Sequence, residues 1–276
     1  PAFLRASGYQ RPPERRYPID LTYSSQFFRI PPGRLSEKAV IDVPTLEKPS
    51  GAGLLAYEDG TAIVTLLGYA GYRTPTDLTG FLASAGECLP SEVSSVLQES
   101  EPIGDVSVQH YPVSVWRRYD KLKRFPSGYL VLGDAFCSFN PVFGQGMTSS
   151  AVQASVLHRC LAHGRDDLSR RFFRGSAKKL APMWLANRTT DYTIMPSDKK
   201  VQSQLKKLAN LAMDRVWAAA TIDTTLVEAV VRQMQHLDPP TALWAPAMLR
   251  RVIVGNRRLA ADPFIEPSSN DEPTHI

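Results

Sequence analysis

The chain has little of what marks several classes of protein. Its 276 residues include only three cysteines, Cys88, Cys137 and Cys160, and none belongs to a Cys-x-x-Cys pair. This pattern predicts reduced thiols in a cytoplasmic protein rather than a disulfide framework. The five histidines lack the spacing of zinc ligands, so no metal site is expected. No apolar run approaches the length of a bilayer crossing, so we expect no membrane span.

The charge is modest. A formal net charge of +5 comes from basic pairs scattered along the chain, without a helix-turn-helix pattern or a zinc finger. We therefore expect a solvated surface or attraction to acidic small molecules rather than nucleic-acid binding. With 43% hydrophobic residues, the chain can bury the core of one large domain or two smaller ones.

The first part of the chain has the texture of an antiparallel sheet. The segments 19–30, 38–44, 53–57 and 61–68 are rich in β-branched and apolar residues and are separated by short turns. Asp59-Gly60 between the last two predicts a hairpin. A further strand is expected over 106–116, where Pro112 indicates an edge position or a bulge.

Helices are expected over 76–89, 91–99, 147–163, 168–180, 199–219, 221–236 and 241–250. Pro182 is expected to break the fourth of them. In the helix over 147–163, the predicted buried stripe consists of Met147, Ala151, Ala154, Leu157 and Leu161. The polar, Pro- and Ser-rich segment 262–276 is expected to be disordered.

The segment Gly51–Ala56 matches the dinucleotide-binding pattern G-x-G-x-x-G/A by letter alone. That pattern requires a strand before it and a helix after it. Here the hairpin turn at Asp59-Gly60 follows within three residues, which leaves no room for a helix. We therefore interpret this segment as a loop that leads into a strand.

A second glycine-containing segment has the context of a binding loop. The apolar run 129–132 is typical of a strand buried on both faces of a parallel sheet, and Gly133-Asp134 follows it. After Pro141 come Gly144-Gln145-Gly146 and the start of a helix. Glycines allow close approach of the main chain to a ligand, and the first N–H groups of a helix attract negative charge. The alternative is a plain strand-loop-helix connection whose glycines only make turns and whose Asp is only a cap.

The run Gly133-Asp134-Ala135, Pro141 and Gly144-Gln145-Gly146-Met147 resembles the second FAD-binding signature of para-hydroxybenzoate hydroxylase-like FAD oxidoreductases, the flavin-dependent aromatic hydroxylases. The resemblance implies that Asp134 holds the ribityl chain of FAD and that Pro141 lies beside the flavin ring. It further implies that Gly144, Gln145, Gly146, Met147 and Thr148 face the N1–C2=O edge of the flavin. The order of a β-rich segment followed by the signature and then helices also matches the family.

The resemblance implies an FAD-dependent monooxygenase that hydroxylates a small aromatic or apolar substrate with NAD(P)H and O2. Two alternatives stay open: a reductase or halogenase of the same fold, and a flavin-free module that binds a ligand or a partner. The family's N-terminal G-x-G-x-x-G unit is not in the sequence, which begins at Pro1 with residues similar to those that follow a later Asp-Gly signature. The chain is thus expected to be the C-terminal part of such a protein, completed by a missing N-terminal segment or associating with itself.

The fold expected is α/β (α+β), with part of a Rossmann-like FAD-binding domain. The expected organisation is a mainly antiparallel substrate-side domain over 1–127, the FAD-binding strand-loop-helix over 128–165 and a helical region over 166–261. The substrate is expected between flavin and sheet, where five strand residues are weak candidates for its lining: Tyr23, Gln26, Phe28, Arg29 and Trp116.

Overall fold

The computed structural model describes residues 1–45, 47–69, 71–194, 204–235, 237–239 and 241–261. It divides into two units, Pro1–Pro196 and Ser197–Ile276. The helix that begins at Leu168 packs on the core of the first unit. The segment predicted to be a disordered tail lies outside the described residues.

The first unit is built on one six-stranded sheet in the order β2-β3-β4-β1-β5-β6, and every neighbouring pair is antiparallel. The strands are β1 (Glu14–Arg29), β2 (Ala39–Asp42), β3 (Ser50–Ala56), β4 (Thr61–Gly68), β5 (Glu101–Arg117) and β6 (Cys137–Ser138). The predicted mixed α and β architecture and the hairpin at Asp59-Gly60 are confirmed. The segment Gly51–Ala56 lies within β3, so the expectation of a loop there was wrong. The next element is β4 and not a helix, so the rejection of the dinucleotide pattern is confirmed.

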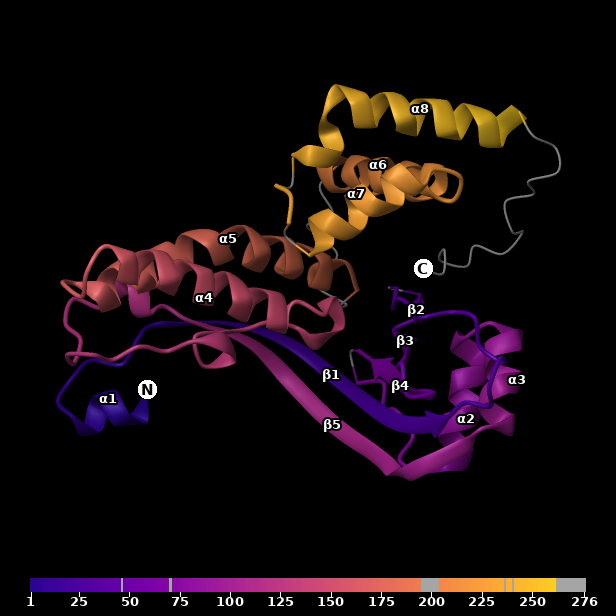
Figure 1. Ribbon diagram of the computed structural model, residues 1–276, viewed down its shortest axis with the longest axis horizontal. Helices are drawn as coiled ribbons and strands as arrows, with labels where there is room; N and C mark the ends of the chain where they lie inside the picture. The colour runs from indigo at the N-terminus through magenta and orange to yellow at the C-terminus, as the bar shows by residue number, and fades with distance from the viewer. Residues whose placement is uncertain (46, 70, 195–203, 236, 240, 262–276) are drawn as a thin grey trace. The chain divides into compact units, whose positions relative to one another are not determined.

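The long strands β1 and β5 run side by side (Figure 1), and both contribute residues to two apolar cores. Helices α2 (Leu78–Cys88) and α3 (Ser91–Glu99) cover the end of the sheet formed by β2, β3 and β4, with Phe28, Leu54 and Phe81 between them. Asp77 caps α2 by accepting a hydrogen bond from the Gly80 N–H at 2.9 Å.

The second core joins β1 and β5 to helix α5 (Leu168–Ile194), and α1 (Ala2–Ala6) contributes Leu4 to it. Helix α4 (Gly146–Ala162) also packs here. The two 3-10 turns η1 (Tyr119–Lys121) and η2 (Gly133–Ala135) precede β6, and a third, η3 (Pro141–Phe143), precedes α4. The buried aromatic residues of this core are Tyr17, Tyr69, Trp116, Tyr119, Phe136, Phe139, Phe172, Phe173 and Trp184.

Proline 112 sits where the β1–β5 ladder is irregular. The register shifts between Pro18 and Leu21 of β1, opposite Val113 and Tyr111, so two residues face Pro112. Asp20 of this bulge has a positive φ of 39°. Because proline has no N–H to donate to a ladder, the bulge is placed where such a bond is not needed, as predicted.

The prediction of a buried parallel strand over 129–132 was wrong. These residues form no strand, Leu132 is exposed, and no parallel pair occurs in the described part of the chain. A strand exists only with a ladder partner, and no described segment pairs with this one. Apolar composition alone therefore gave a false signal.

The predicted buried stripe of α4 was wrong as well. Met147, Ala151, Ala154 and Leu161 are exposed and Leu157 is partly buried. The residues that α4 buries are Ser149, Gln153 and Val156. The physical reason is a backbone N–H that needs a partner: the Gly133 N–H donates to Gln153 Oε1 at 2.9 Å, which turns the polar face inward.

Pro182 does not break α5, which runs through it. Proline removes one backbone hydrogen bond, but Leu180 before it and Met183 and Trp184 after it are all buried in the same core. Tertiary packing on both sides thus outweighs the local preference.

The second unit contains α6 (Gln204–Ala220), α7 (Thr224–Met234), the 3-10 turn η4 (Ala242–Trp244) and α8 (Pro246–Ala261). Residues 199–203 of the predicted fifth helix and residue 236 of the predicted sixth lie outside the described part. The last helix extends to Ala261 instead of ending at Arg250, because Val252 and Gly255 pack in the unit's core. A side chain at Gly255 would lie 2.8 Å from the Ala219 Cβ, so α6 and α8 approach closely there.

Candidate functional site

The candidate binding loop begins with a tight turn at Gly133. Gly133 has a φ of +63°, and a Cβ there would lie 3.3 Å from Ser150 Oγ. Its N–H is bonded to Gln153 of α4. Glycine is therefore required on conformational grounds, and the turn is tied to the helix that ends the loop.

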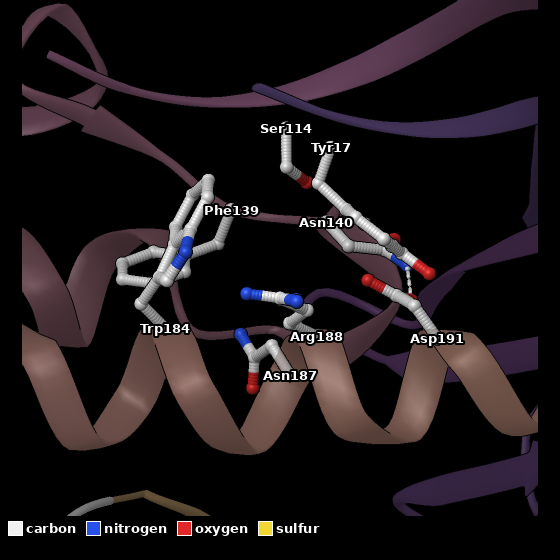
Figure 2. Close-up of a pocket in the computed structure, with 8 residues that line it drawn as sticks. All are labelled: Tyr17, Ser114, Phe139, Asn140, Trp184, Asn187, Arg188 and Asp191. Carbon is white, nitrogen blue, oxygen red and sulfur yellow. Dashed lines mark hydrogen bonds between the residues drawn. The ribbon is translucent and has the colours of Figure 1, made fainter. Parts of the chain in front are cut away.

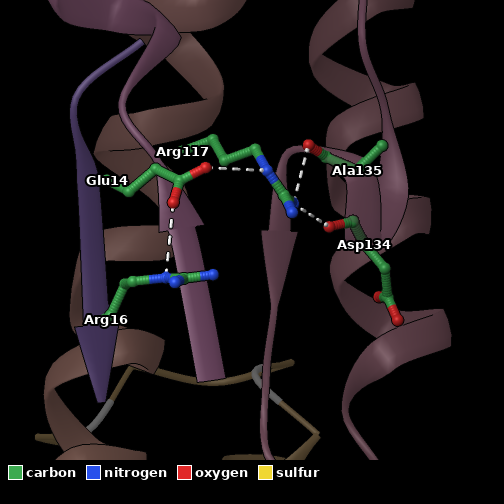
Figure 3. A network of polar contacts seen from close by, with 5 residues as sticks. All are labelled: Glu14, Arg16, Arg117, Asp134 and Ala135. Atoms are coloured by element: carbon green, nitrogen blue, oxygen red, sulfur yellow. Dashed lines mark hydrogen bonds and ion pairs between the residues drawn. The ribbon is translucent and has the colours of Figure 1, made fainter. Parts of the chain in front are cut away.

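Asp134 directs its carboxylate toward the start of α4. The main-chain carbonyls of Asp134 and Ala135 accept hydrogen bonds from the Arg117 guanidinium at 3.2 and 3.3 Å, and Arg117 pairs with Glu14 at 3.4 Å (Figure 3). Arg16 completes this network through Glu14 at 3.3 Å. The Asp134 side chain is exposed, and a Cβ added to Gly146 would lie 3.9 Å from its Oδ1. Asp134 and Gly146, which are twelve residues apart in the motif, are therefore close together in the structure.

The middle of the loop is a short 3-10 turn. The Asn140 side chain accepts a hydrogen bond from the Val142 N–H at 3.1 Å, and Pro141 occupies the first position of the turn. The Gly144 N–H donates to the Pro141 carbonyl at 3.0 Å, and Gly144 adopts a left-handed conformation with φ 62°. No heavy atom lies within 4 Å of the position of a Cβ at Gly144, so the main chain is open to a ligand here.

Helix α4 starts without a side-chain cap. Gln145 occupies the cap position, but its side chain makes no cap hydrogen bond and its Oε1 instead accepts from Asn187 Nδ2 at 2.9 Å. Gly146 begins the helix, Met147 beside it is 86% exposed, and Thr148 is partly buried. The first N–H groups of a helix lack intrahelical partners and carry the positive end of its dipole. The arrangement suits an electron-rich ligand edge.

Buried polar side chains of α5 form hydrogen bonds with the loop. Asn140 Nδ2 donates to Asp191 Oδ1 at 2.6 Å and to the Tyr69 hydroxyl oxygen at 2.5 Å, and the Tyr69 hydroxyl donates to Asp191 at 3.5 Å. Figure 2 shows Asn140 and Asp191 meeting beside a cavity of about 10 Å³. Trp184 packs against Phe139, with ring centroids 6.1 Å apart.

Burial sets the protonation of several groups here. Burial raises the pKa of the Asp191 carboxyl to about 6, although its hydrogen bonds to Asn140 and Tyr69 oppose the rise. Burial also raises the pKa of the Tyr69 hydroxyl and of the Cys137 thiol. Cys137 is therefore a protonated, unreactive thiol at neutral pH.

Most of the five weak candidates for the substrate lining are packed in a core or paired with other residues of the protein. Gln26 is buried and donates to the Phe27, Ile103 and Gly104 carbonyls at 3.0, 3.1 and 3.2 Å. Phe28 is fully buried in the core under α2, and Arg29 is exposed and paired with Glu101 at 3.6 Å. Trp116 is buried between the Arg118 guanidinium and Trp184.

Tyr23 is partly buried against the second core. The structure thus does not bring these five side chains together. The cavity beside the loop has a different lining: Tyr17, Ser114, Phe139, Asn140, Trp184, Asn187, Arg188 and Asp191.

Sequence reasoning missed the groups that hold the loop: Tyr69, Arg117, Asn140, Gln153, Asn187 and Asp191. One signal could have revealed part of the set. Asn187 and Asp191 are four residues apart, and Trp184 precedes Asn187 by three, so all three lie on one helical face. Two polar residues beside a tryptophan on a buried face indicate polar partners elsewhere in the fold.

Among the described residues, no group of three or more His, Cys, Asp or Glu side chains is placed to hold a metal ion. The three cysteines form no disulfide. None of the described helices combines the length and the apolar character needed to cross a membrane.

The chain is 35% identical over 263 residues to Protein Rv3254 of Mycobacterium tuberculosis, covering 94% of this chain and 56% of that protein. No protein-family model matches.

Among solved structures, the flavin-dependent brominase Bmp2 is similar with a TM-score of 0.49 and 14% identity, over 93% of this chain and 60% of that one. The flavin-dependent halogenase CmlS gives a TM-score of 0.47 and 17% identity, over 85% and 48%. The Diels-Alderase PyrE3 gives 0.46 and 18%, over 85% and 47%. The chain spans about half the length of the proteins it matches.

Proposed function

We propose that this chain is the flavin-facing part of an FAD-dependent oxidoreductase, in which the loop 133–148 holds the ribityl chain and the ring of FAD. The observation that carries the proposal is the meeting of the Asp134 carboxylate with Gly146 at the uncapped start of α4. An anionic acceptor and a row of N–H donors on adjoining positions match a ligand that has hydroxyl groups next to an electron-rich carbonyl edge.

The residues fit such a ligand at one end. Asp134 would accept hydrogen bonds from ribityl hydroxyls, because an ionised carboxylate only accepts. Gly144, with open space at its Cβ position, and Pro141 would line the ring, and the N–H groups of Gly146 and Met147 would face its carbonyl edge. Contacts for the pyrophosphate and adenosine would come from a Rossmann-like segment outside these residues.

When bound, FAD would supply the redox chemistry, accepting a hydride from NAD(P)H and passing electrons to O2 for hydroxylation of a small aromatic or apolar substrate. This chain's own residues position the ring and stabilise negative charge at its carbonyl edge through the dipole of α4. A reductase or a halogenase would use the same loop, and a product assay of the whole protein separates these activities.

A flavin-free docking module is the second candidate. It is favoured by the exposed apolar side chains on α4, of which Met147 and Leu161 are the largest. Such a module would need no ligand at the loop, so flavin binding separates the two functions.

Replacing Asp134 tests the flavin proposal at the residue that defines it. We expect Asp134→Ala to weaken flavin binding about tenfold or more, because a hydrogen bond to a charged group is lost. The measurement is titration of the purified chain with FAD, followed by the change in flavin absorbance and fluorescence.

Asp166→Ala is the matched control, because Asp166 is an exposed aspartate outside the loop. It should bind as the unaltered chain does. Equal affinities of Asp134→Ala and the unaltered chain would contradict the role given to Asp134.

A further inference from the structure

Helix α5 contacts the loop with two polar side chains spaced one turn apart. Asn187 Nδ2 donates to Gln145 Oε1 at 2.9 Å, and Asp191 Oδ1 accepts from Asn140 Nδ2 at 2.6 Å. Both helix residues are buried, and both loop residues are buried as well. Asp191 contacts the residue before η3, and Asn187 contacts the N-cap residue of α4. The two contacts therefore lie on either side of Pro141–Gly144.

Each of the two contacted loop residues also forms a hydrogen bond with the loop's main chain or with the first turn of α4. Asn140 accepts from the Val142 N–H through its side-chain oxygen, so its amide links Asp191 to the main chain of the turn. The Gln145 carbonyl accepts from the Ser149 N–H at 2.9 Å in the first turn of α4. Moving Asn187 or Asp191 would therefore move the backbone that surrounds Gly144.

Asp191 is the acidic residue at the centre of this contact. The groups that face it or share its cavity are Tyr69 at the end of β4, Tyr17 of β1, Ser114 of β5, Asn140 of the loop, and Asn187 and Arg188 of α5. Arg188 is the only one of these lining residues with an always-charged side chain, and that side chain is exposed. Asp191 is 1% exposed, and its carboxyl accepts hydrogen bonds from a neutral amide and a phenol.

The cavity beside Asp191 is lined in part by polar side chains. Its volume of about 10 Å³ suits one water molecule, and the buried Ser114 Oγ that lines it has no hydrogen-bond partner among the described residues. A water at this position would satisfy Ser114 and join the buried cluster to the exposed side at Arg188.

We propose that Asn187 and Asp191 are positioning residues for residues 139–146 of the loop 133–148. We further propose that the protonation state of Asp191 controls how readily this part of the loop opens. The proposal rests on the proposed function only for the loop's role as the flavin site; the coupling itself is a property of the chain alone. Opening hydrates the carboxyl, so opening is favoured when Asp191 is ionised and opposed when it is protonated.

Amide hydrogen exchange of the loop, measured without flavin, tests the proposal. After correction for intrinsic exchange rates, protection of peptides that cover Val142 should fall about tenfold between pH ~5 and pH ~7.5, since the carboxyl titrates near pH 6 in the closed loop. Asp191→Asn should abolish this pH dependence. Asn187→Ala should lower protection by a similar factor at every pH, because it removes a bond to Gln145 without changing the titrating group.

Asp166→Asn, the same chemical change at an exposed aspartate, should leave the pH profile of the unaltered chain in place. A flat profile in the unaltered chain, or an unchanged profile in Asp191→Asn, would overturn the proposal. The carboxyl 13C shift of Asp191 in the unaltered chain provides a measurement without any variant: titration near pH 6 supports the proposal and titration near pH 4 overturns it. Loss of flavin binding with the pH profile intact would reject the flavin function and leave this inference standing.

Discussion

At the scale of single residues, the site combines an exposed carboxylate with a buried one. Asp134 is exposed and lies beside the start of α4, where its carboxylate can accept hydrogen bonds from a ligand. Asp191 lies behind the same loop, where its partners are an amide and a phenol. The first is suited to binding, and the second is suited to holding the loop in place.

The buried position of Asp191 has a cost in stability that depends on pH. Its folded pKa of about 6 lies above the ordinary value of 3.8, so its stabilising contribution is complete below pH ~4 and is lost as pH rises through ~6. We compare the free energy of unfolding of Asp191→Asn with that of the unaltered chain. We expect the difference to grow in favour of the variant by about 1–2 kcal/mol as the pH rises from ~5 to ~8. Urea unfolding at several pH values measures this difference. Should the two chains keep a constant difference from pH 5 to 8, the carboxyl would not titrate in this range.

At the scale of elements, the predictions that held were those in which local chemistry and tertiary structure agree. The hairpin at Asp59-Gly60 depends on neighbouring residues only, so the sequence contains the necessary information. The segment 129–132 and the stripe of α4 failed because their burial depends on partners far away in the chain. No rule of periodicity states that Gln153 must turn inward to meet the Gly133 N–H.

The candidate site shows the same division. Gly133 and Gly144 could be found because each adopts a positive φ, a conformation that glycine accommodates locally. Asn187 and Asp191 could not be assigned to the loop, because their partners are 42 and 51 residues away. Contacts at such separation require the fold to be known.

Helix α5 offers a test of how tertiary packing overrides local preference. Pro182 is exposed and lies inside the helix, where it removes one backbone hydrogen bond. We expect Pro182→Ala to raise the free energy of unfolding by about 2 kcal/mol, the gain in helix propensity less the entropy added to the unfolded chain. Chemical denaturation measures the change.

Pro32→Ala is the matched control, since Pro32 is exposed in a turn and gains no helix propensity. It should be neutral or slightly destabilising. A loss of stability in Pro182→Ala larger than that of Pro32→Ala would show that Pro182 stabilises a bend that α5 needs.

At the scale of the whole molecule, the proposed function assigns one end of a flavin site to this chain. The loop 133–148 is held by hydrogen bonds from Arg117 to its main chain and from Asn187 of α5 to Gln145. The described residues provide no second glycine-rich helix start for a pyrophosphate, since Gly51 and Gly53 lie in β3. If the flavin proposal holds, the part of the ligand that this chain recognises is the ring and the ribityl chain.

The most direct test of this claim compares riboflavin with FAD. Equilibrium dialysis of the purified chain against each flavin, with the Asp134→Ala variant in parallel, measures which part of the ligand is recognised. We expect the unaltered chain to bind riboflavin and FAD with similar affinity and the variant to bind both about tenfold more weakly. Failure of the unaltered chain to retain either flavin at high concentration would contradict the assignment of the loop 133–148 as a flavin site.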